Sequence, residues 1–284
     1  MKLFSAIVLL TLLILPIYGQ LITGKVVDSG TGEPLVYASI GIIGTPVGAI
    51  TDENGNFKID VTGQPLNAII RISLISYQPQ TITVEEACNK ENTIKLISAP
   101  TQLAEVVIRP SGKLKQVGIT TFDRKWVGGW PGYEYGKGHE CGLRIKLGSS
   151  PVKIMSMHIF VYKQSFDTSI FRLHVRSIAH RRPSEELLSD NIFITITKNS
   201  GLVDIDLSQY NLVFKGDIAL SLEWVKVIGV HIDRFYNPKN STMEPMPVVF
   251  FNCSNKGLTY TKRGSENKWL LTKHYPSIYL TVQE

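Results

Sequence analysis

Apolar and polar residues alternate with a period of two along most of this chain, and that period is typical of half-buried β-strands. Phe57, Ile59 and Val61, for example, are separated by Lys58 and Asp60. Patterns with the 3.6-residue period of a helix are nearly absent, and the two short helical candidates are residues 85–88 and 184–188. Further strands are predicted at residues 35–43, 142–147, 152–162, 192–197, 202–207, 212–214, 218–225, 227–232, 248–252, 258–261 and 278–282.

The same alternation gives residues 171–176 two contrasting faces. The odd positions are apolar, whereas the even positions are Arg172, His174 and Arg176. Successive side chains of a strand point to opposite sides of the sheet, so we expect one buried face and one basic face. Because basic side chains are usually exposed, a solvated basic face is the stronger expectation and an anion site the weaker one.

Residues 24–61 contain two predicted turns. The segment DSGTGE at residues 28–33 holds two glycines and side chains that can bond to their own backbone, which predicts a turn. Asn54-Gly55 predicts a hairpin turn, because both residues tolerate the positive φ that such turns require.

A family pattern is superimposed on these strands and turns. It consists of GKVVD at 24–28, TGEPL at 31–35, Ala38, GT at 44–45, TD followed by Gly55 and Phe57 at 51–57, IS at 72–73 and ISY at 75–77, TIKL at 93–96 and QLAEVVI at 102–108.

In these positions the first third of the chain resembles the carboxypeptidase regulatory-like domain. The resemblance implies a small transthyretin-like β-sandwich, of a kind that occurs beside zinc carboxypeptidases and at the N-terminus of outer-membrane TonB-dependent transporters. In those transporters the domain leads to a TonB-contacting segment, a contact that we do not expect for residues 105–108. The module is joined to many different partners, so the resemblance implies no particular activity.

The chain therefore divides into four predicted parts. Residues 1–19 have Lys2, an apolar run and Pro16, as in a secretory signal peptide, and predict an exported protein that is periplasmic, outer-membrane associated or secreted. We expect no transmembrane segment after cleavage. Residues 20–108 form the carboxypeptidase regulatory-like sandwich, residues 109–118 a linker, and residues 119–284 a larger, jelly-roll-like β-sandwich.

The charge distribution and the cysteines give little information about the partners of the protein. Residues 20–108 hold five Lys/Arg and nine Asp/Glu, a formal charge of −4, whereas residues 109–284 hold twenty-four and fifteen, a charge of +9. An exported basic domain could meet anionic glycans, and an ordinary solvated surface is the simpler alternative. No nucleic-acid motif is present, so we expect no nucleic-acid partner. Among three cysteines, Cys141 and Cys253 are the favoured disulfide pair, with buried thiols as the alternative.

Residues 126–136 are rich in aromatic residues and glycine, which predicts an irregular loop. Rings held on such a loop could stack on sugars, so Trp126, Trp130, Tyr133 and Tyr135 are the candidate ligand-binding residues. The competing and stronger interpretation is that these rings cover one end of the sandwich.

Motifs for catalysis are missing. None of the six histidines has the glutamate spacing of a zinc carboxypeptidase, and adjacent strand residues such as His139 and Glu140 point to opposite faces. We therefore expect no metal, no cofactor and no catalytic residue. Asp204, Asp206 and Glu223 could form a glycosidase pair, but outward-facing acids are the better interpretation.

Together these features predict an exported, all-β, non-catalytic cell-envelope protein that serves as a binding or accessory module. Its partner would be a glycan or another envelope protein. The alternative is a hydrolase, either a peptidase or a glycosidase, whose site in the second domain is not visible as a motif. A deep pocket that gathers His174 with the carboxylates of Asp204, Asp206 or Glu223 would favour that alternative.

Overall fold

The structure, a computed structural model, describes residues 20–89, 92–99, 112–121, 123–131, 137–230, 234–237, 242–245, 248–254, 258–272 and 275–284. At residues 123–131, 234–237, 242–245, 248–250, 252–254 and 275 only the backbone is described. The predicted signal peptide at residues 1–19 lies outside the described residues. No helix in the described part of the chain has the length and apolar character that crossing a bilayer requires.

The first domain is a sandwich of two four-stranded sheets. One sheet has the order β4 (Asn56–Asp60), β1 (Leu21–Asp28), β8 (Asn92–Ser98) and β6 (Tyr77–Gln78). The other has the order β3 (Gly48–Ile50), β2 (Ser39–Ile42), β5 (Ile69–Ser73) and β7 (Gln80–Thr83). The short helix α2 (Val84–Cys88) follows β7 and begins with a capping box between Thr83 and Glu86, which confirms the helix predicted at residues 85–88.

The second domain packs two larger sheets face to face. The first contains β10 (Asp123–Pro131), β21 (Val248–Ser254), β12 (Val152–Gln164), β25 (Ile278–Gln283) and β9 (Leu114–Gly118), joined by β16 (Gly201–Asp206), β17 (Val213–Phe214) and β24 (Tyr275–Pro276). The second contains β14 (Arg182–Glu186), β13 (Phe166–Ala179), β18 (Asp217–Val230), β11 (Glu140–Lys146), β22 (Thr259–Lys262) and β23 (Leu270–Thr272), joined by β15 (Ile192–Ile196). A separate hairpin joins β19 (Arg234–Asn237) to β20 (Thr242–Pro245), and a 3-10 turn spans Ser208–Tyr210.

The all-β prediction is confirmed, because both domains are sandwiches whose inner faces carry the apolar residues. One core runs through residues 22–96, and the other gathers apolar side chains from both sheets of the second domain. Ile75 belongs to the first domain by sequence but packs into the core of the second domain. The two hydrophobic cores therefore meet at the junction between the domains.

Three local expectations were wrong. Residues 182–186 form the strand β14 rather than a helix, because they pair with β13 and five residues cannot hold a helix without help. The strand predicted at residues 35–43 is confined to β2, since Tyr37 adopts φ 60° and Thr51 Oγ1 bonds the backbone of Leu35 and Ala38. The predicted aromatic loop at residues 126–136 overlaps the strand β10, which pairs with β21 from Pro131↔Val248 back to Asp123↔Cys253.

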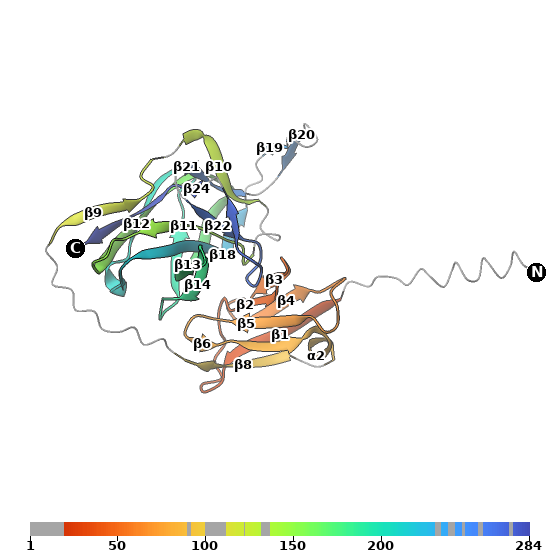
Figure 1. Cartoon of the computed structure of the whole chain (residues 1–284). Helices are drawn as coiled ribbons and strands as arrows, with labels where there is room; N and C mark the ends of the chain where they lie inside the picture. The colour runs from red at the N-terminus through yellow and green to blue at the C-terminus, as the bar shows by residue number, and fades with distance from the viewer. Residues whose placement is uncertain are drawn as a thin grey trace, which may run out of the picture.

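Among the described residues, the first domain contacts the second mainly through the sheet that contains β2, β3 and β5. Figure 1 shows β2, β3 and β5 nearest the second domain, whereas β1, β8 and α2 lie on the far side. The sheet with β13 and β14 faces it from above in the same view. Strand β9 occupies the last five positions of the predicted linker and pairs with β25. The junction that results is where polar side chains gather.

Candidate functional site

The candidate site lies between the domains and is built on the outer face of the sheet that contains β13. Phe171, Leu173 and Val175 are fully buried in the core, so the intervening residues of β13 point the other way. The predicted division of residues 171–176 into two faces is thus correct. The solvated state expected for the basic face is wrong, because Arg172 is 2% exposed and His174 is 5% exposed.

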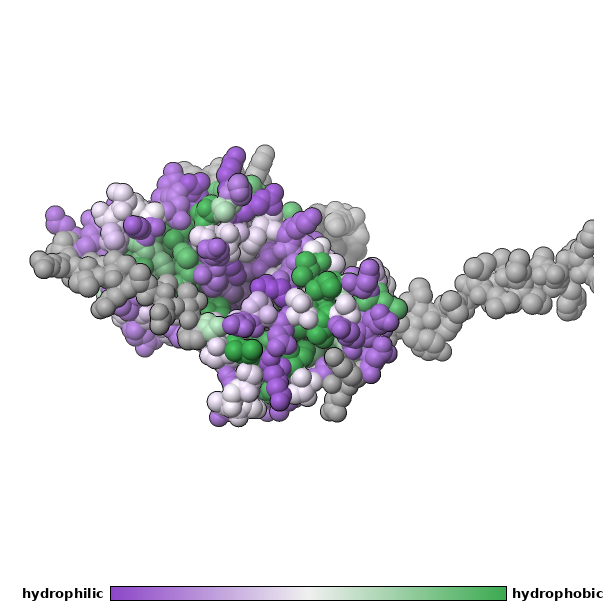
Figure 2. All heavy atoms as spheres, turned by 60° about the horizontal axis from the view of Figure 1, so that its bottom comes forward, coloured by the Kyte–Doolittle hydropathy of each residue, from purple (hydrophilic) through white to green (hydrophobic). Residues whose placement is uncertain are grey.

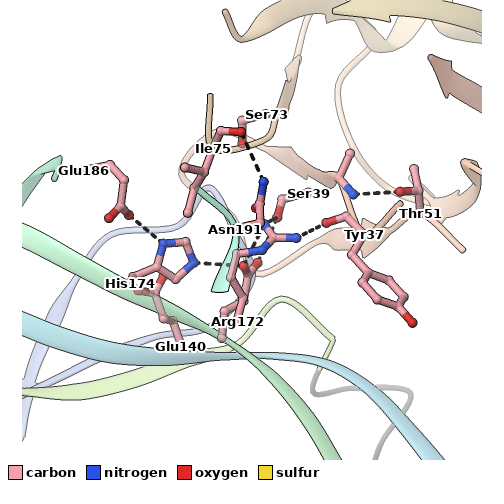
Figure 3. A network of polar contacts seen from close by, with 12 residues as sticks. Tyr37, Ser39, Thr51, Ser73, Ile75, Glu140, Arg172, His174, Glu186 and Asn191 are labelled. Carbon is pink, nitrogen blue, oxygen red and sulfur yellow. Dashed lines mark hydrogen bonds and ion pairs between the residues drawn. The ribbon is translucent and has the colours of Figure 1, made fainter. Parts of the chain in front are cut away.

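Seven charged side chains from five strands form this site, which we call the charge cluster. They come from β11, β13, β14, β18 and β22, all in one sheet. The members are Glu140, Arg172, His174, Arg176, Glu186, Glu223 and Lys262. Figure 3 shows this face of the sheet turned toward the loop and strand residues of the first domain.

Glu223 lies at the centre of the cluster. Its carboxylate accepts from Arg172 Nη1 at 3.3 Å and from His174 Nε2 at 3.1 Å, and its other oxygen accepts from Ser39 Oγ at 2.9 Å. Arg172 and Glu223 are also cross-strand neighbours in the β13–β18 register. Burial raises the pKa of Glu223, but Arg172 and His174 outweigh it and bring the pKa to about 2.

The other two carboxylates are paired as well. Glu140 contacts Arg176, accepts from Lys262 Nζ at 3.0 Å and from Ser221 Oγ at 2.5 Å. Glu186 accepts from the backbone amide of Val175 at 3.1 Å and contacts both His174 and Arg176. Burial raises the pKa of each carboxyl, but the neighbouring cations hold it below its usual range. All three carboxylates are therefore ionised at neutral pH.

His174 is the member of the cluster whose ordinary pKa is nearest to neutral pH. Its Nδ1 is 2.6 Å from Glu186 Oε2, and its Nε2 faces Glu223. Arg176 Nη2 is 2.8 Å from the same Nδ1 and opposes a second proton there. Burial and Arg176 lower the pKa of His174, but Glu140 and Glu186 raise it further, and the net direction is upward. With a carboxylate at both ring nitrogens, we assign the protonated ring.

The cluster is tied to the first domain by direct hydrogen bonds. Arg172 donates to the backbone carbonyl of Tyr37 and, at 3.4 Å, to Ser39 Oγ. The ring of Tyr37 packs edge-on against Phe193, and the Arg172 guanidinium lies 5.7 Å from the same Phe193 ring. These contacts bury a charged pair that would otherwise face water.

Further contacts close the junction on both sides of the cluster. Arg71 Nη1 and Ser73 Oγ donate to Glu266 at 3.0 and 3.3 Å, and the amide of Gly44 donates to the Glu266 carbonyl at 2.9 Å. Asn191 Nδ2 donates to the Ile75 carbonyl at 3.2 Å. Elsewhere at the junction, Ser76 donates to the Ser189 carbonyl and Lys226 pairs with Glu53.

The carboxylates singled out from the sequence are not brought together. Glu223 and His174 share the cluster, whereas Asp204 and Asp206 lie on β16, in the other sheet of the second domain. Asp206 caps the backbone amide of Ser208, and the Asp204 side chain is 61% exposed beside His158. Among the described residues no group of three or more His, Cys, Asp and Glu side chains is arranged to hold a metal ion.

The four aromatic candidates remain untested as ligand-binding residues. Trp126 and Trp130 lie on β10, where only the backbone is described, and Tyr133 and Tyr135 lie outside the described residues. The proposed Cys141–Cys253 disulfide also stays a prediction, because the Cys253 side chain is not described. Sequence reasoning missed Glu186 and Lys262 and considered Glu140 only as a metal ligand. Glu186 lies on β14, next to the basic face of β13, whereas Glu140 and Lys262 lie on β11 and β22, two and three strands away from β13.

Comparisons with known proteins concern mainly the first domain. A family model described as CarboxypepD_reg-like domain matches residues 22–108. The TonB-dependent receptor SusC of Bacteroides thetaiotaomicron is 36% identical over 104 residues, which are 36% of this chain and 10% of the receptor. The matched part thus spans only a tenth of that relative.

The similarity to solved structures is weak. The cysteine protease and lectin-like domains of Cwp84, a surface layer associated protein of Clostridium difficile, align with 94% of this chain and 59% of theirs at 9% identity and a TM-score of 0.36. A structure of the infectious bursal disease virus Gx strain aligns with 93% and 59% at 8% identity and a TM-score of 0.23. Both scores are too low to support a shared fold. The sequence match and the two-sheet architecture together place residues 22–108 of this chain in the CarboxypepD_reg-like domain family.

Proposed function

We propose that this protein is an exported, non-catalytic binding module of the cell envelope, in which the CarboxypepD_reg-like domain and the second sandwich act as one unit. The family match and the similarity to a TonB-dependent receptor support the envelope setting. The contacts of Ser39 and Tyr37 with Arg172 and Glu223 support a fixed arrangement of the two domains.

The observation that carries the proposal is the pairing of every carboxylate in the charge cluster. A general acid of a glycosidase needs a raised pKa, so that it holds a proton at neutral pH. The pKa values of Glu140, Glu186 and Glu223 are all lowered instead. Their oxygens also already accept hydrogen bonds from neighbouring residues. Ionised carboxylates that already accept hydrogen bonds are better suited to hold a ligand in a fixed position than to transfer a proton.

A glycan is the ligand class that we propose, because the charge cluster lies beside the Trp269 ring, and because the sequence of residues 126–136 is rich in aromatic residues. The test is a glycan-array screen of residues 20–284, with Trp130→Ala as the variant and Tyr210→Ala as the control for loss of an exposed ring. We expect binding that Trp130→Ala or a change in the charge cluster reduces by tenfold or more. Absence of binding to any glycan would overturn the glycan assignment.

One observation favours the hydrolase alternative. On β12 and β16, Ser156 Oγ lies 2.9 Å from His158 Nε2, and His158 Nδ1 lies 2.5 Å from Asp204 Oδ1. This order of serine, histidine and carboxylate resembles a hydrolytic triad. However, Thr281 Oγ1 occupies the same Nε2 at 2.9 Å, and Tyr279 stacks on the imidazole with ring centroids 4.3 Å apart. A network that joins β12, β16 and β25 explains the same contacts.

A covalent serine-hydrolase probe distinguishes these two roles. A fluorophosphonate should leave Ser156 unmodified if the network is structural, and Ser156→Ala should behave like the unchanged protein toward p-nitrophenyl esters. Labelling that disappears in both Ser156→Ala and His158→Gln would establish an activated serine and make the hydrolase the better account.

A further inference from the structure

The junction between the domains contains a half-open cavity of about 480 Å³. Its walls come from β2, β5 and the segment after β5 in the first domain, and from the charge cluster and residues 265–269 in the second domain. Figure 2 shows hydrophilic side chains on both sides of the hollow between the domains. A cavity of this volume is in the range of small-molecule sites, and its position at a domain interface is typical of them.

Hydrogen-bond donors remain in this cavity after the acceptors are satisfied. Glu140, Glu186 and Glu223 each accept from two or more neighbours. By contrast, Lys262 carries three N–H groups and bonds only Glu140 among the described residues. The buried Arg172 Nε and Ser265 Oγ also have no hydrogen-bond partner in the described part of the chain, but both atoms are shielded from solvent, so an occupant of the cavity would reach Lys262 more readily. An occupant rich in acceptors would complement this lining.

The balance of charge points in the same direction. The charge cluster holds three carboxylates and, with His174 protonated, four cations, so one positive charge is in excess. Arg71 and Glu266 in the wall pair with each other and add no net charge. Glu185 also lines the cavity and brings the formal charge of the lining to zero, but its side chain is exposed, so water screens this charge and the excess remains among the buried groups. A single carboxylate would neutralise the excess, whereas a phosphate dianion would exceed it.

The cavity also offers apolar surface beside the cations. Trp269 and Tyr77 line it, and both are half-buried. Lys262 Nζ lies 4.9 Å from the Trp269 ring centroid and the Arg176 guanidinium 5.5 Å from it, so cations and an aromatic ring share one wall. The volume exceeds that of a bare carboxylate. A ring with apolar C–H edges, several hydroxyl groups and one carboxylate would use all of these features.

We propose that the interdomain cavity binds a carboxylate-bearing saccharide of the hexuronic acid type, with its carboxylate directed to Lys262. This inference rests on the proposed glycan-binding function and specifies its site and ligand class. Residues of both domains line the site, so the ligand also joins the domains. Occupancy should therefore stabilise the two-domain unit by mass action.

Isothermal titration calorimetry of residues 20–284 with galacturonate and digalacturonate tests the proposal, with galactose and inorganic phosphate as matched ligands. We expect binding of the acidic sugars at least tenfold tighter than that of galactose or phosphate. Lys262→Met should weaken binding of the acidic sugars by tenfold or more. The more exposed Arg71→Gln should also weaken it by tenfold or more, because it leaves the Glu266 carboxylate unpaired in the cavity wall, where it repels the carboxylate of the ligand. Lys226→Met, which removes an ion pair at the junction outside the cavity lining, should leave binding unchanged.

Two results would overturn the proposal: no preference for the acidic sugars, or unchanged affinity in a folded Arg71→Gln protein. Circular dichroism establishes that each variant is folded, and Arg71→Gln keeps the test valid if Lys262→Met does not fold. If the array detects glycans but the acidic sugars do not need Lys262 or Arg71, the binding module stands and this site assignment fails. If no glycan binds at all, the proposed function fails with it.

Discussion

The residues that define this molecule are a few charged side chains buried where two sandwiches meet. Arg172 and Glu223 are each about 2% exposed and face each other across two strands. A buried ion pair of this kind adds little net stability when intact, because desolvating both charges offsets their attraction. Removing one partner is different, since the remaining charge is then buried without compensation.

Arg172→Met should therefore lower the free energy of unfolding by about 3–5 kcal/mol, because Glu223 keeps its burial and loses one of its two cationic partners, with His174 as the other. The matched control is Lys115→Met, which breaks the exposed pair with Glu284 and should cost under about 1 kcal/mol. Urea unfolding followed by tryptophan fluorescence measures both. Equal effects of the two substitutions would show that the pair is not buried in solution.

The protonation of His174 should make the stability of the protein depend on pH. Its folded-state pKa is raised above the unfolded value near 6.5, so the stability contributed by the protonated ring is fully present below pH 6.5. That contribution is lost as the pH rises through the folded-state pKa. The unfolding free energy of the unchanged protein minus that of His174→Gln should therefore decrease between pH 6 and pH 9. A difference that grows over this range would contradict the protonated assignment and favour the neutral ring bonded to Arg176.

At the scale of elements, alternation predicted most strands and the two faces of β13, but it could not say what covers the second face. Alternation is local, whereas Ser39 contacts Glu223 across 184 positions of sequence. The helix predicted at residues 184–188 was wrong for a related reason. Pairing with β13 and the bonds of Glu186 to Val175 and His174 outweigh a weak helical tendency. The site residues Glu140 and Lys262 depend on the same long-range pairing of β11 with β18 and β22.

The pairing of β11 with β18 makes Gly142 sensitive to any side chain. A Cβ at this position would lie 2.1 Å from the Leu220 carbonyl oxygen and 2.4 Å from Ser221 Cβ. Gly142→Ala should lower the free energy of unfolding by about 1–3 kcal/mol or more, as overpacking does. Gly30→Ala is the control, because its nearest neighbour is the Asp28 side chain at 3.3 Å. A chemical-denaturation midpoint for Gly142→Ala equal to that of the control would argue against this strand register.

At the scale of the whole molecule, the two sandwiches form one unit with a polar interface between them. Opposite formal charges of the two parts, −4 and +9, were visible in the sequence and agree with a basic face covered by the first domain. The sequence did not show how the two domains contact each other, because the contact depends on the close approach of residues 265–266 to the backbone at Gly41 and Gly44. Glycine at position 41 leaves room for Ser265 and Glu266.

Gly41→Leu should separate the domains without unfolding them. Even its Cβ would lie 2.6 Å from Ser265 Oγ and 2.9 Å from Glu266 Cγ. In hydrogen exchange read by mass spectrometry, amides at the junction, such as Gly44, should exchange faster, while β1 and β8 keep their protection. Lys58→Leu on the far sheet is the control and should change neither region. Unchanged exchange at the junction in Gly41→Leu would mean that the domains are not in contact there.

The central claim is that the charge cluster of the second domain is bonded directly to the first domain, and a double-mutant cycle between Ser39→Ala and Glu223→Gln tests it most directly. The two side chains share a buried hydrogen bond of 2.9 Å. Equilibrium unfolding of the unchanged protein, both single variants and the double variant should give a coupling free energy of about 1–3 kcal/mol, as expected for a hydrogen bond to a charged group. A coupling within about 0.3 kcal/mol of zero would contradict the account.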